Sequence, residues 1–245
     1  MIVVVGLAFE ARIAAGPGVR VICSGDGRTL AGRLQDAISE GRAFAGDCPG
    51  IVSFGVAGGL APTLRPGTCI IATAIVSGAQ HMPTDAAWSQ RFMQTIPDAV
   101  AGTLLGVPAP VAHPDEKRAL HQQTGAIAVD MESHIVAVIG ARNGVPVAAV
   151  RVITDPAKRA LPQSALAAMR ANGTTDIGAM IRSVLSSPSE IPALIRTALD
   201  ARAARATLIR GRKLLDPTFK TSAEANQPVL VKARPKAIAH SSRYA

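Results

Sequence analysis

Two short apolar segments, separated by one predicted helix, constrain the fold of this chain most strongly. Residues 126–129 and 147–153 are rich in Ala, Val and Ile, as in strands that are covered on both faces. The residues between them, Ser133–Asn143, predict a helix that ends at Gly144. Strand, helix and strand in succession normally form a parallel pair, so we expect an α/β fold in which both strands end at the same sheet edge.

A carboxylate follows each of these strands, Glu132 after the first and Asp155 after the second. Open α/β folds bind ligands beyond the carboxyl ends of their strands, so the pair predicts acid–base chemistry or stabilisation of a cation. Each residue also has a structural explanation. Asp155 before Pro156 is a common helix start with Asp as the N-cap, and a first-turn Glu132 interacts favourably with the helix dipole.

The N-terminal half alternates predicted strands and helices, which favours a sheet with helices on both faces. The predicted strands are Ile2–Val5, Val19–Ser24, Ile51–Val56 and Thr68–Val76, and the predicted helices are Arg28–Gly41, Thr84–Thr95 and Asp115–Gln123.

The C-terminal part predicts one long helix and a tail. The helix spans Ile191–Arg210, and we expect one apolar stripe to pack it on the sheet. Beyond residue 216 the sequence loses periodicity and gains Pro, polar and basic residues. We therefore divide the chain into a domain at 1–213 and a basic, flexible tail at 214–245. The expected stripe consists of Leu194, Ile195, Ala198, Leu199, Ala206 and Ile209.

Charge and composition exclude several classes of protein. The net charge of +9 is concentrated at the end, because residues 196–245 hold eleven Lys and Arg against three Asp and Glu. The nearly neutral body argues against nucleic-acid binding, whereas the basic end permits contact with an anionic membrane surface. No apolar stretch reaches the roughly 18–20 residues of a membrane span, and the first residues do not form a signal peptide. We expect a cytoplasmic protein, peripheral at the inner membrane face if the basic end binds lipid.

Metal and thiol chemistry have no support in the sequence. The three cysteines, Cys23, Cys48 and Cys69, are scattered, as in a reduced protein. His81 and His113 are isolated, so we expect neither a metal site nor a cofactor.

Two further segments are candidate ligand contacts. Residues 55–59, Gly-Val-Ala-Gly-Gly, follow a strand and could let a ligand approach the backbone, or could form a tight turn with close strand packing. Their spacing is not that of a dinucleotide-binding fingerprint. Glu10, after the first strand, is either an acid–base group or an early-helix glutamate.

Three of these segments, in the same order, resemble the purine nucleoside phosphorylase and nucleosidase superfamily. Residues 55–67 resemble its glycine-rich segment, 129–132 its ribose motif and 151–155 its Arg-x-Ile-Ser-Asp motif, as in methylthioadenosine/S-adenosylhomocysteine nucleosidases. Residues 6–12, 83–88, 129–134 and 194–200 further resemble one branch, the hopanoid-associated phosphorylase-like proteins, which act as adenosylhopane nucleosidases.

The resemblance implies a three-layer fold with a mixed central sheet, and an enzyme that releases adenine from adenosylhopane in hopanoid biosynthesis. Methylthioadenosine/S-adenosylhomocysteine nucleosidase, purine nucleoside phosphorylase and a non-catalytic binding protein are the alternatives. Asp155 would protonate or hydrogen-bond purine N7, Glu132 would hold the ribose hydroxyls and stabilise the cationic sugar, and Glu10 would orient or deprotonate the attacking water. The implied substrate-binding residues are Ala57, Gly58, Asp130, Met131, Arg151 and Thr154.

The resemblance is incomplete where phosphorylases bind phosphate. Residues 6–10 lack the Gly-Asp-Pro-x-Arg segment of the hexameric enzymes, and Ser53 and Val56 occupy the positions of an Arg and a Ser. Arg12 or Arg65 could substitute, so phosphate remains a possible co-substrate, but the departures favour water as nucleophile. Residues 156–180, expected at the pocket mouth, contain no aromatic residue. The family implies a homo-oligomer, usually a dimer.

Overall fold

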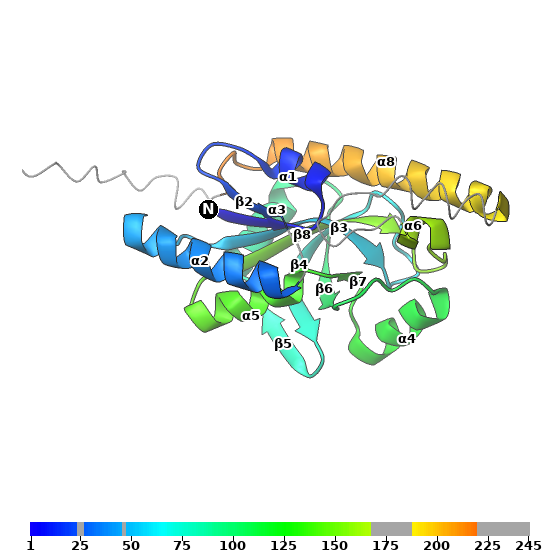
Figure 1. Cartoon of the computed structure of the whole chain (residues 1–245), viewed down its shortest axis with the longest axis horizontal. Helices are drawn as coiled ribbons and strands as arrows, with labels where there is room; N and C mark the ends of the chain where they lie inside the picture. Colours follow the sequence, from blue (N-terminus) through cyan, green and yellow to red (C-terminus); the bar gives the residue numbers. More distant parts are fainter. Residues whose placement is uncertain (24–26, 46–47, 168–187, 220–245) are drawn as a thin grey trace, which may run out of the picture.

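The computed structural model describes residues 1–23, 27–45, 48–167 and 188–219 (Figure 1). Residues 220–245 of the flexible tail predicted at 214–245 lie outside these residues, as does the part of the pocket mouth predicted beyond residue 167. The strands are β1 (Ile2–Val5), β2 (Arg20–Cys23), β3 (Ile51–Gly59), β4 (Cys69–Ser77), β5 (Gln80–Pro83), β6 (Val100–Gly106), β7 (Ala128–Asp130) and β8 (Val147–Asp155). The helices are α1 (Ala8–Ala14), α2 (Gly27–Ala45), α3 (Ala86–Thr95), α4 (Pro114–Thr124), α5 (Ser133–Asn143), α6 (Gln163–Ala167), a 3-10 turn (Pro188–Glu190) and α8 (Ile191–Leu214).

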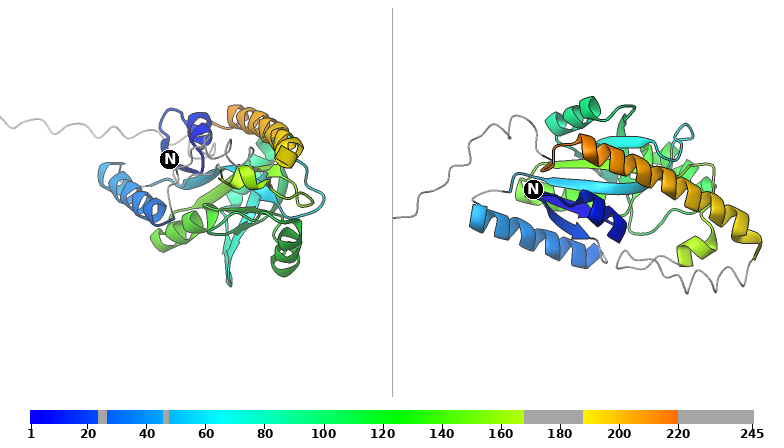
Figure 2. Two further views of the ribbon diagram at one scale, coloured as in Figure 1. Left: turned by 45° about the vertical axis from the view of Figure 1, so that its right-hand side comes forward. Right: turned by 90° about the horizontal axis from the view of Figure 1, so that it is seen from above.

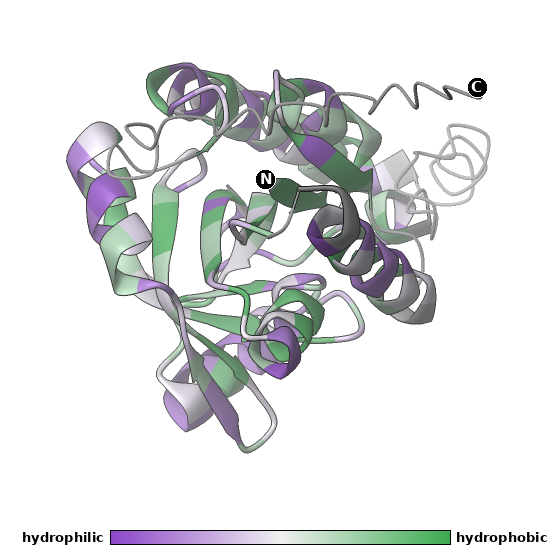
Figure 3. Ribbon diagram, turned by 90° about the vertical axis from the view of Figure 1, so that its left-hand side faces the viewer, coloured by the Kyte–Doolittle hydropathy of each residue, from purple (hydrophilic) through white to green (hydrophobic). Residues whose placement is uncertain are grey.

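The described strands form one mixed sheet, which confirms the predicted fold class. Its order is β2-β1-β3-β7-β6-β4-β5, and β8 pairs with both β3 and β4. The strands β3, β7, β6, β4 and β8 therefore close into a ring. Helices α2 and α5 cover one face, and α1, α3 and α8 cover the other (Figures 1 and 2). Figure 3 shows apolar residues concentrated in the strands between these helix layers.

The predicted parallel pairing of the strands around α5 is wrong. β7 runs antiparallel to β3, whereas β8 runs parallel to β3, so β7 and β8 run in opposite directions. The two strands still meet one site because β3 lies between them. Gly58 of β3 is opposite Val129 on one side and Asp155 on the other. Closure of the sheet into a ring, which the local sequence does not encode, replaces the expected common edge.

Helix α8 is present as predicted, but its expected apolar stripe is largely wrong. The side buried against the sheet carries Ala204, Leu208 and Gly211, whereas Ile195 and Leu199 are 56% and 59% exposed. Ala198 and Ala206 are also exposed. The later turns of α8 pack on β8 and β3, whereas Ile195 and Leu199 lie on the earlier turns and on the opposite side of the helix, so burial follows the position of the sheet and not hydropathy alone.

The globular part ends later than the sequence predicts. Leu215 and Phe219 are buried, although both follow the expected boundary at residue 213. The Phe219 ring lies edge-on to Phe54 at 5.6 Å and has the Arg212 guanidinium over it at 4.2 Å. Within the described ranges, no helix combines the length and the apolarity needed to cross a membrane.

Candidate active site

A pocket of about 150 Å³ lies where the ends of β1, β3 and β8 meet the junction between β7 and α5. Eight of the nine predicted site residues line it; Arg151 is the exception. The apolar wall from the 107–111 loop is not predicted from the sequence, whereas Leu161, in the loop after β8, belongs to the segment 156–180 that was expected at the pocket mouth. The lining residues are Gly6, Leu7, Glu10, Val56, Ala57, Gly58, Val107, Ala109, Pro110, Val111, Val129, Asp130, Met131, Glu132, Thr154, Asp155 and Leu161.

Glu10 is held by the backbone at the start of α1. One carboxylate oxygen accepts from the N–H groups of Gly6 (2.9 Å) and Leu7 (2.8 Å), and the other accepts from Val56 N–H (2.7 Å). The early-helix interpretation of Glu10 is therefore correct, and it coexists with a position in the pocket wall. Burial raises the pKa of Glu10, while Arg151 and the three N–H groups oppose the rise. A buried carboxylate of raised pKa is suited to accept a proton.

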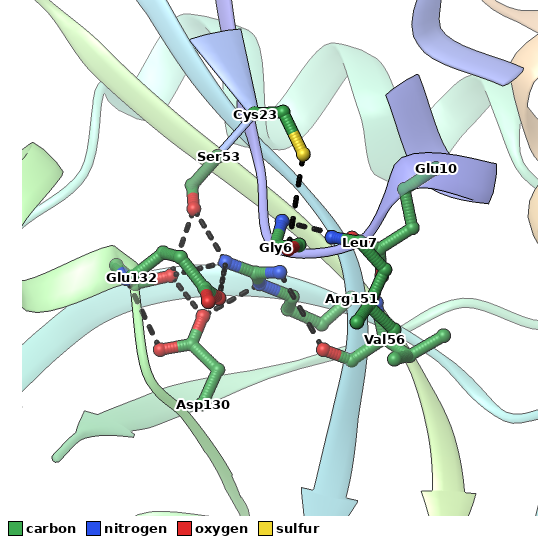
Figure 4. A network of polar contacts seen from close by, with 10 residues as sticks. Gly6, Leu7, Glu10, Cys23, Ser53, Val56, Asp130, Glu132 and Arg151 are labelled. Carbon is green, nitrogen blue, oxygen red and sulfur yellow. Dashed lines mark hydrogen bonds and ion pairs between the residues drawn. The ribbon is translucent and has the colours of Figure 1, made fainter. Parts of the chain in front are cut away.

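Arg151 lies at the centre of the polar network on the acidic side of the site (Figure 4). It is fully buried, and its Nε lies 2.6 Å from Asp130 Oδ2. Its Nη2 donates to Ser53 Oγ (2.7 Å) and lies 3.4 Å from Glu132 Oε2. Asp130 also accepts hydrogen bonds from the N–H and hydroxyl of Ser133. The predicted direct contact of Arg151 with substrate is therefore corrected: its guanidinium is enclosed by protein groups and orients carboxylates that do line the pocket.

Glu132 lies at the N-terminus of α5, with its side chain 13% exposed. Its Oε1 would be only 2.7 Å from a Cβ added to Gly6, so it lies directly over the end of β1. Burial raises the pKa of Glu132 to about 7; Arg151 opposes this shift, and Asp130 and Glu10 reinforce it. Glu132 is therefore a carboxylate whose charge changes close to neutral pH.

Asp155 does not begin a helix, so its interpretation as a helix cap is wrong. The chain continues from Pro156 as a turn, and the next helix, α6, starts only at Gln163. Asp155 Oδ1 accepts a hydrogen bond from Thr154 Oγ1 at 2.8 Å, and Oδ2 accepts one from Lys117 Nζ at 2.7 Å. Lys117 was missed because one lysine in an amphipathic helix gives no signal in the sequence.

Glycines in β3 let the carboxylates approach the backbone. A Cβ on Gly55 would lie 2.5 Å from Glu10 Oε1, and one on Gly58 would lie 3.0 Å from Asp155 Oδ2. The predicted tight turn is wrong, because residues 55–59 continue strand β3, whereas the predicted close packing is found. The approach of a ligand to this backbone stays a prediction.

Cations that could hold phosphate are not found where the sequence suggested them. Arg12 and Arg65 are exposed and do not line the pocket. In the described part of the chain, no group of three or more His, Cys, Asp or Glu side chains is arranged to hold a metal ion.

The fold and the pocket define a mixed-sheet α/β protein with an acidic ligand site at its central strands. Residues 5–186 match the model of the phosphorylase superfamily. The chain belongs to this superfamily, which confirms the predicted enzyme class, nucleosidase or phosphorylase, at superfamily level.

Solved structures show the same fold at low sequence identity. A Helicobacter pylori methylthioadenosine/S-adenosylhomocysteine nucleosidase is 16% identical, with a TM-score of 0.57 over 87% of this chain and 97% of that one. A putative methylthioadenosine nucleosidase from Weissella paramesenteroides is 18% identical, with a TM-score of 0.53 over 87% and 97%. H. pylori futalosine hydrolase is 14% identical, with a TM-score of 0.55 over 86% and 96%. Comparison with curated proteins gave no match.

Proposed function

We propose that this protein hydrolyses the N-glycosidic bond of an adenine nucleoside and that its substrate is adenosylhopane. The observation that carries the proposal is the single pocket lined by Glu10, Glu132 and Asp155. The superfamily and the structural similarity to nucleosidases support the reaction class. The sequence resemblance to hopanoid-associated proteins supports the particular substrate.

The three carboxylates match the charges that develop when the bond breaks. Positive charge grows on the ribose and negative charge on the purine. Glu132 stabilises the cationic sugar and holds its hydroxyls. Asp155 protonates or hydrogen-bonds purine N7 as the base leaves, and Glu10 takes a proton from the attacking water. Met131 lies against the ribose, and Ala57 and Gly58 border the base.

Water suits this pocket better than phosphate. A phosphate dianion would meet the four carboxylates that line the pocket, and like charges repel strongly where water is excluded. The two buried cations beside the pocket are already bound to its carboxylates, Arg151 to Asp130 and Glu132 and Lys117 to Asp155. Hydrolysis is therefore favoured over phosphorolysis.

The apolar wall supports a substrate with an apolar 5′ group. Val107, Ala109, Pro110, Val111 and Leu161 line the pocket, and none of the described lining residues is aromatic. Such a wall offers contact to hydrocarbon. A small 5′ group, as in methylthioadenosine, would make fewer of these contacts. Methylthioadenosine is nevertheless the second candidate substrate, because several structural relatives act on it.

The test is adenine release, followed by chromatography, from adenosylhopane and from methylthioadenosine, each with and without phosphate. We expect faster release from the lipid-linked nucleoside and no phosphate dependence. Asp155→Asn should abolish release, whereas Asp115→Asn, which changes an exposed carboxylate on α4, should not. Release from methylthioadenosine alone would reject the lipid substrate, and strict phosphate dependence would reject hydrolysis.

A further inference from the structure

Lys117, which the sequence did not single out, is the most unusual charged residue behind the pocket. It lies on α4, far along the chain from β8, and its side chain is 0% exposed. Its Nζ donates to Asp155 Oδ2 at 2.7 Å, to the Pro156 carbonyl at 3.3 Å and to the Arg159 carbonyl at 3.2 Å. An ammonium group has three donors, so all of them are used inside the protein.

Removing such an ion pair from water costs free energy. Desolvating an ammonium group and a carboxylate generally offsets most of their attraction, so a buried ion pair is weak evidence for stability. Lys117 instead fixes Asp155, a carboxylate that lines the pocket. Thr154 holds Oδ1 and Lys117 holds Oδ2, so the orientation of Asp155 is determined on both sides.

The contact also addresses how Asp155 obtains a proton. Asp155 accepts a hydrogen bond at each oxygen and is ion-paired with Lys117, so the proton for a leaving purine has to come from a neighbouring donor. Among the described neighbours of Asp155, Lys117 is the charged proton donor in direct contact, and its ammonium group is shielded from solvent. An amine can give up a proton, whereas a guanidinium cannot.

We propose that Lys117 is the positioning residue of the general acid and that the Lys117–Asp155 pair, rather than Asp155 alone, supplies the proton to the leaving adenine. This inference rests on the proposed function. The bond between the sugar C1′ and purine N9 breaks and its electron pair goes to the purine. Lys117 passes a proton to the Asp155 carboxylate, and Asp155 passes it on to N7, which leaves a neutral amine beside a carboxylate. The attacking water gives hydroxide to C1′ and a proton to Glu10, and proton exchange with solvent then restores the starting charges.

The test compares two leaving groups with Lys117→Met. Adenine needs a proton to leave, whereas the p-nitrophenolate of p-nitrophenyl riboside does not. We expect kcat for the adenine nucleoside to fall about 100-fold or more, in the range of general-acid catalysis, and kcat for the nitrophenyl riboside to change by less than about threefold. Lys158→Met, which removes an exposed lysine near the same turn, is the matched control. Equal losses on both substrates would overturn the proposal, and a wild-type protein inactive on both would refute the proposed function instead.

Two further variants distinguish loss of the proton relay from misfolding. Lys117→Arg keeps a cation that cannot release a proton, so it should be slow on the adenine nucleoside and normal on the nitrophenyl riboside. Wild-type activity of this variant on adenine would overturn the relay. Lys117→Met added to Asp155→Asn removes both charges of the pair, and its kcat on the nitrophenyl riboside should equal that of Asp155→Asn alone. A further loss would show that Lys117 acts independently of Asp155.

A second, independent observation concerns the outer surface of α8. Ile191, Ile195 and Leu199 are 42%, 56% and 59% exposed and repeat every four residues, so they form one ridge along the helix. The ridge lies opposite the side that packs on the sheet, on the half of α8 that extends beyond the sheet (Figure 2). Arg196, Arg202 and Arg205 are exposed on the same stretch of helix.

We propose that this ridge binds the surface of an anionic lipid bilayer. An apolar strip flanked by cations is the pattern of helices that lie in a membrane interface, and each well-placed cation adds to binding of anionic lipid. A second copy of the chain would bring the same arginines together, which disfavours self-association. The Arg159–Asp200 ion pair links this helix to the loop after Asp155, so bound lipid would lie close to the pocket.

The test is co-sedimentation of the full chain with vesicles of phosphatidylcholine, with and without phosphatidylglycerol, at low salt. We expect binding that requires phosphatidylglycerol and weakens with salt. Ile195→Glu should reduce it at least tenfold more than Ala193→Glu, which adds the same charge at an exposed position off the ridge. Equal effects of the two variants, absent binding, or an oligomer that Ile195→Glu dissociates would each overturn the proposal.

Discussion

Glu132 should make both activity and stability depend on pH near neutrality. Its pKa rises from an ordinary value of 4.5 to about 7 because the side chain is buried. This difference corresponds to about 3 kcal/mol against the charged form in the folded protein. The folded state therefore binds a proton more tightly than the unfolded state, so stability is greatest below pH 4.5, falls as the pH rises towards 7 and then levels off.

Activity should change in the opposite direction. The cationic sugar needs the ionised Glu132, so kcat/KM should fall about tenfold per pH unit below pH 7. We would measure kcat/KM between pH 5 and 8, and urea unfolding of wild type and Glu132→Gln at pH 5 and 8. Glu132→Gln should lose activity at every pH. We take the free energy of unfolding of Glu132→Gln minus that of wild type. This difference should be about 1–3 kcal/mol more positive at pH 8 than at pH 5.

The matched control is Glu116→Gln, which changes an exposed glutamate on α4. It should show no such difference between the two pH values. A flat activity profile between pH 5 and 8, or a stability difference for Glu132→Gln that does not change with pH, would refute the reasoning.

Three further substitutions test the packing of the site and core. Gly58→Ala places a methyl 3.0 Å from Asp155 Oδ2 and should lower kcat at least tenfold with little change in melting temperature; unchanged kcat would contradict the close approach. Gly140→Ala places a methyl 2.3 Å from Val147 Cγ2, so urea unfolding should show a loss of about 1–3 kcal/mol. Arg151→Met leaves buried carboxylates unpaired and should cost about 3–5 kcal/mol by the same assay, and a neutral effect would contradict its role.

The sequence predicts the elements of this fold well because their patterns are local. The helix Ser133–Asn143 and its stop at Gly144 are found as expected, since Gly144 adopts the left-handed conformation that ends helices. The ring of strands is not predicted, because it depends on β8 pairing with two strands from distant parts of the chain. The predicted direction of β7 relative to β8 is wrong for this reason.

The site shows the same division between local and distant information. Motif residues such as Glu132 and Asp155 were identified because each follows a strand. The role of Lys117 and the burial of Arg151 depend on contacts between residues that are distant in the sequence. Lys117 is 38 residues from Asp155, and Arg151 is 19 residues from Glu132. The predicted stripe of α8 is misplaced because hydropathy favours Ile195 and Leu199, whereas the side that packs on the sheet carries Ala204, Leu208 and Gly211.

The most direct test of the central claim is the fate of the sugar when the reaction runs in ¹⁸O-labelled water with phosphate present. The nucleoside is the one that releases adenine fastest, and the sugar product is analysed by mass spectrometry. The account predicts a free sugar that carries one ¹⁸O and a reaction that disappears in Asp155→Asn. A sugar 1-phosphate without ¹⁸O, or undiminished turnover in Asp155→Asn, would contradict it.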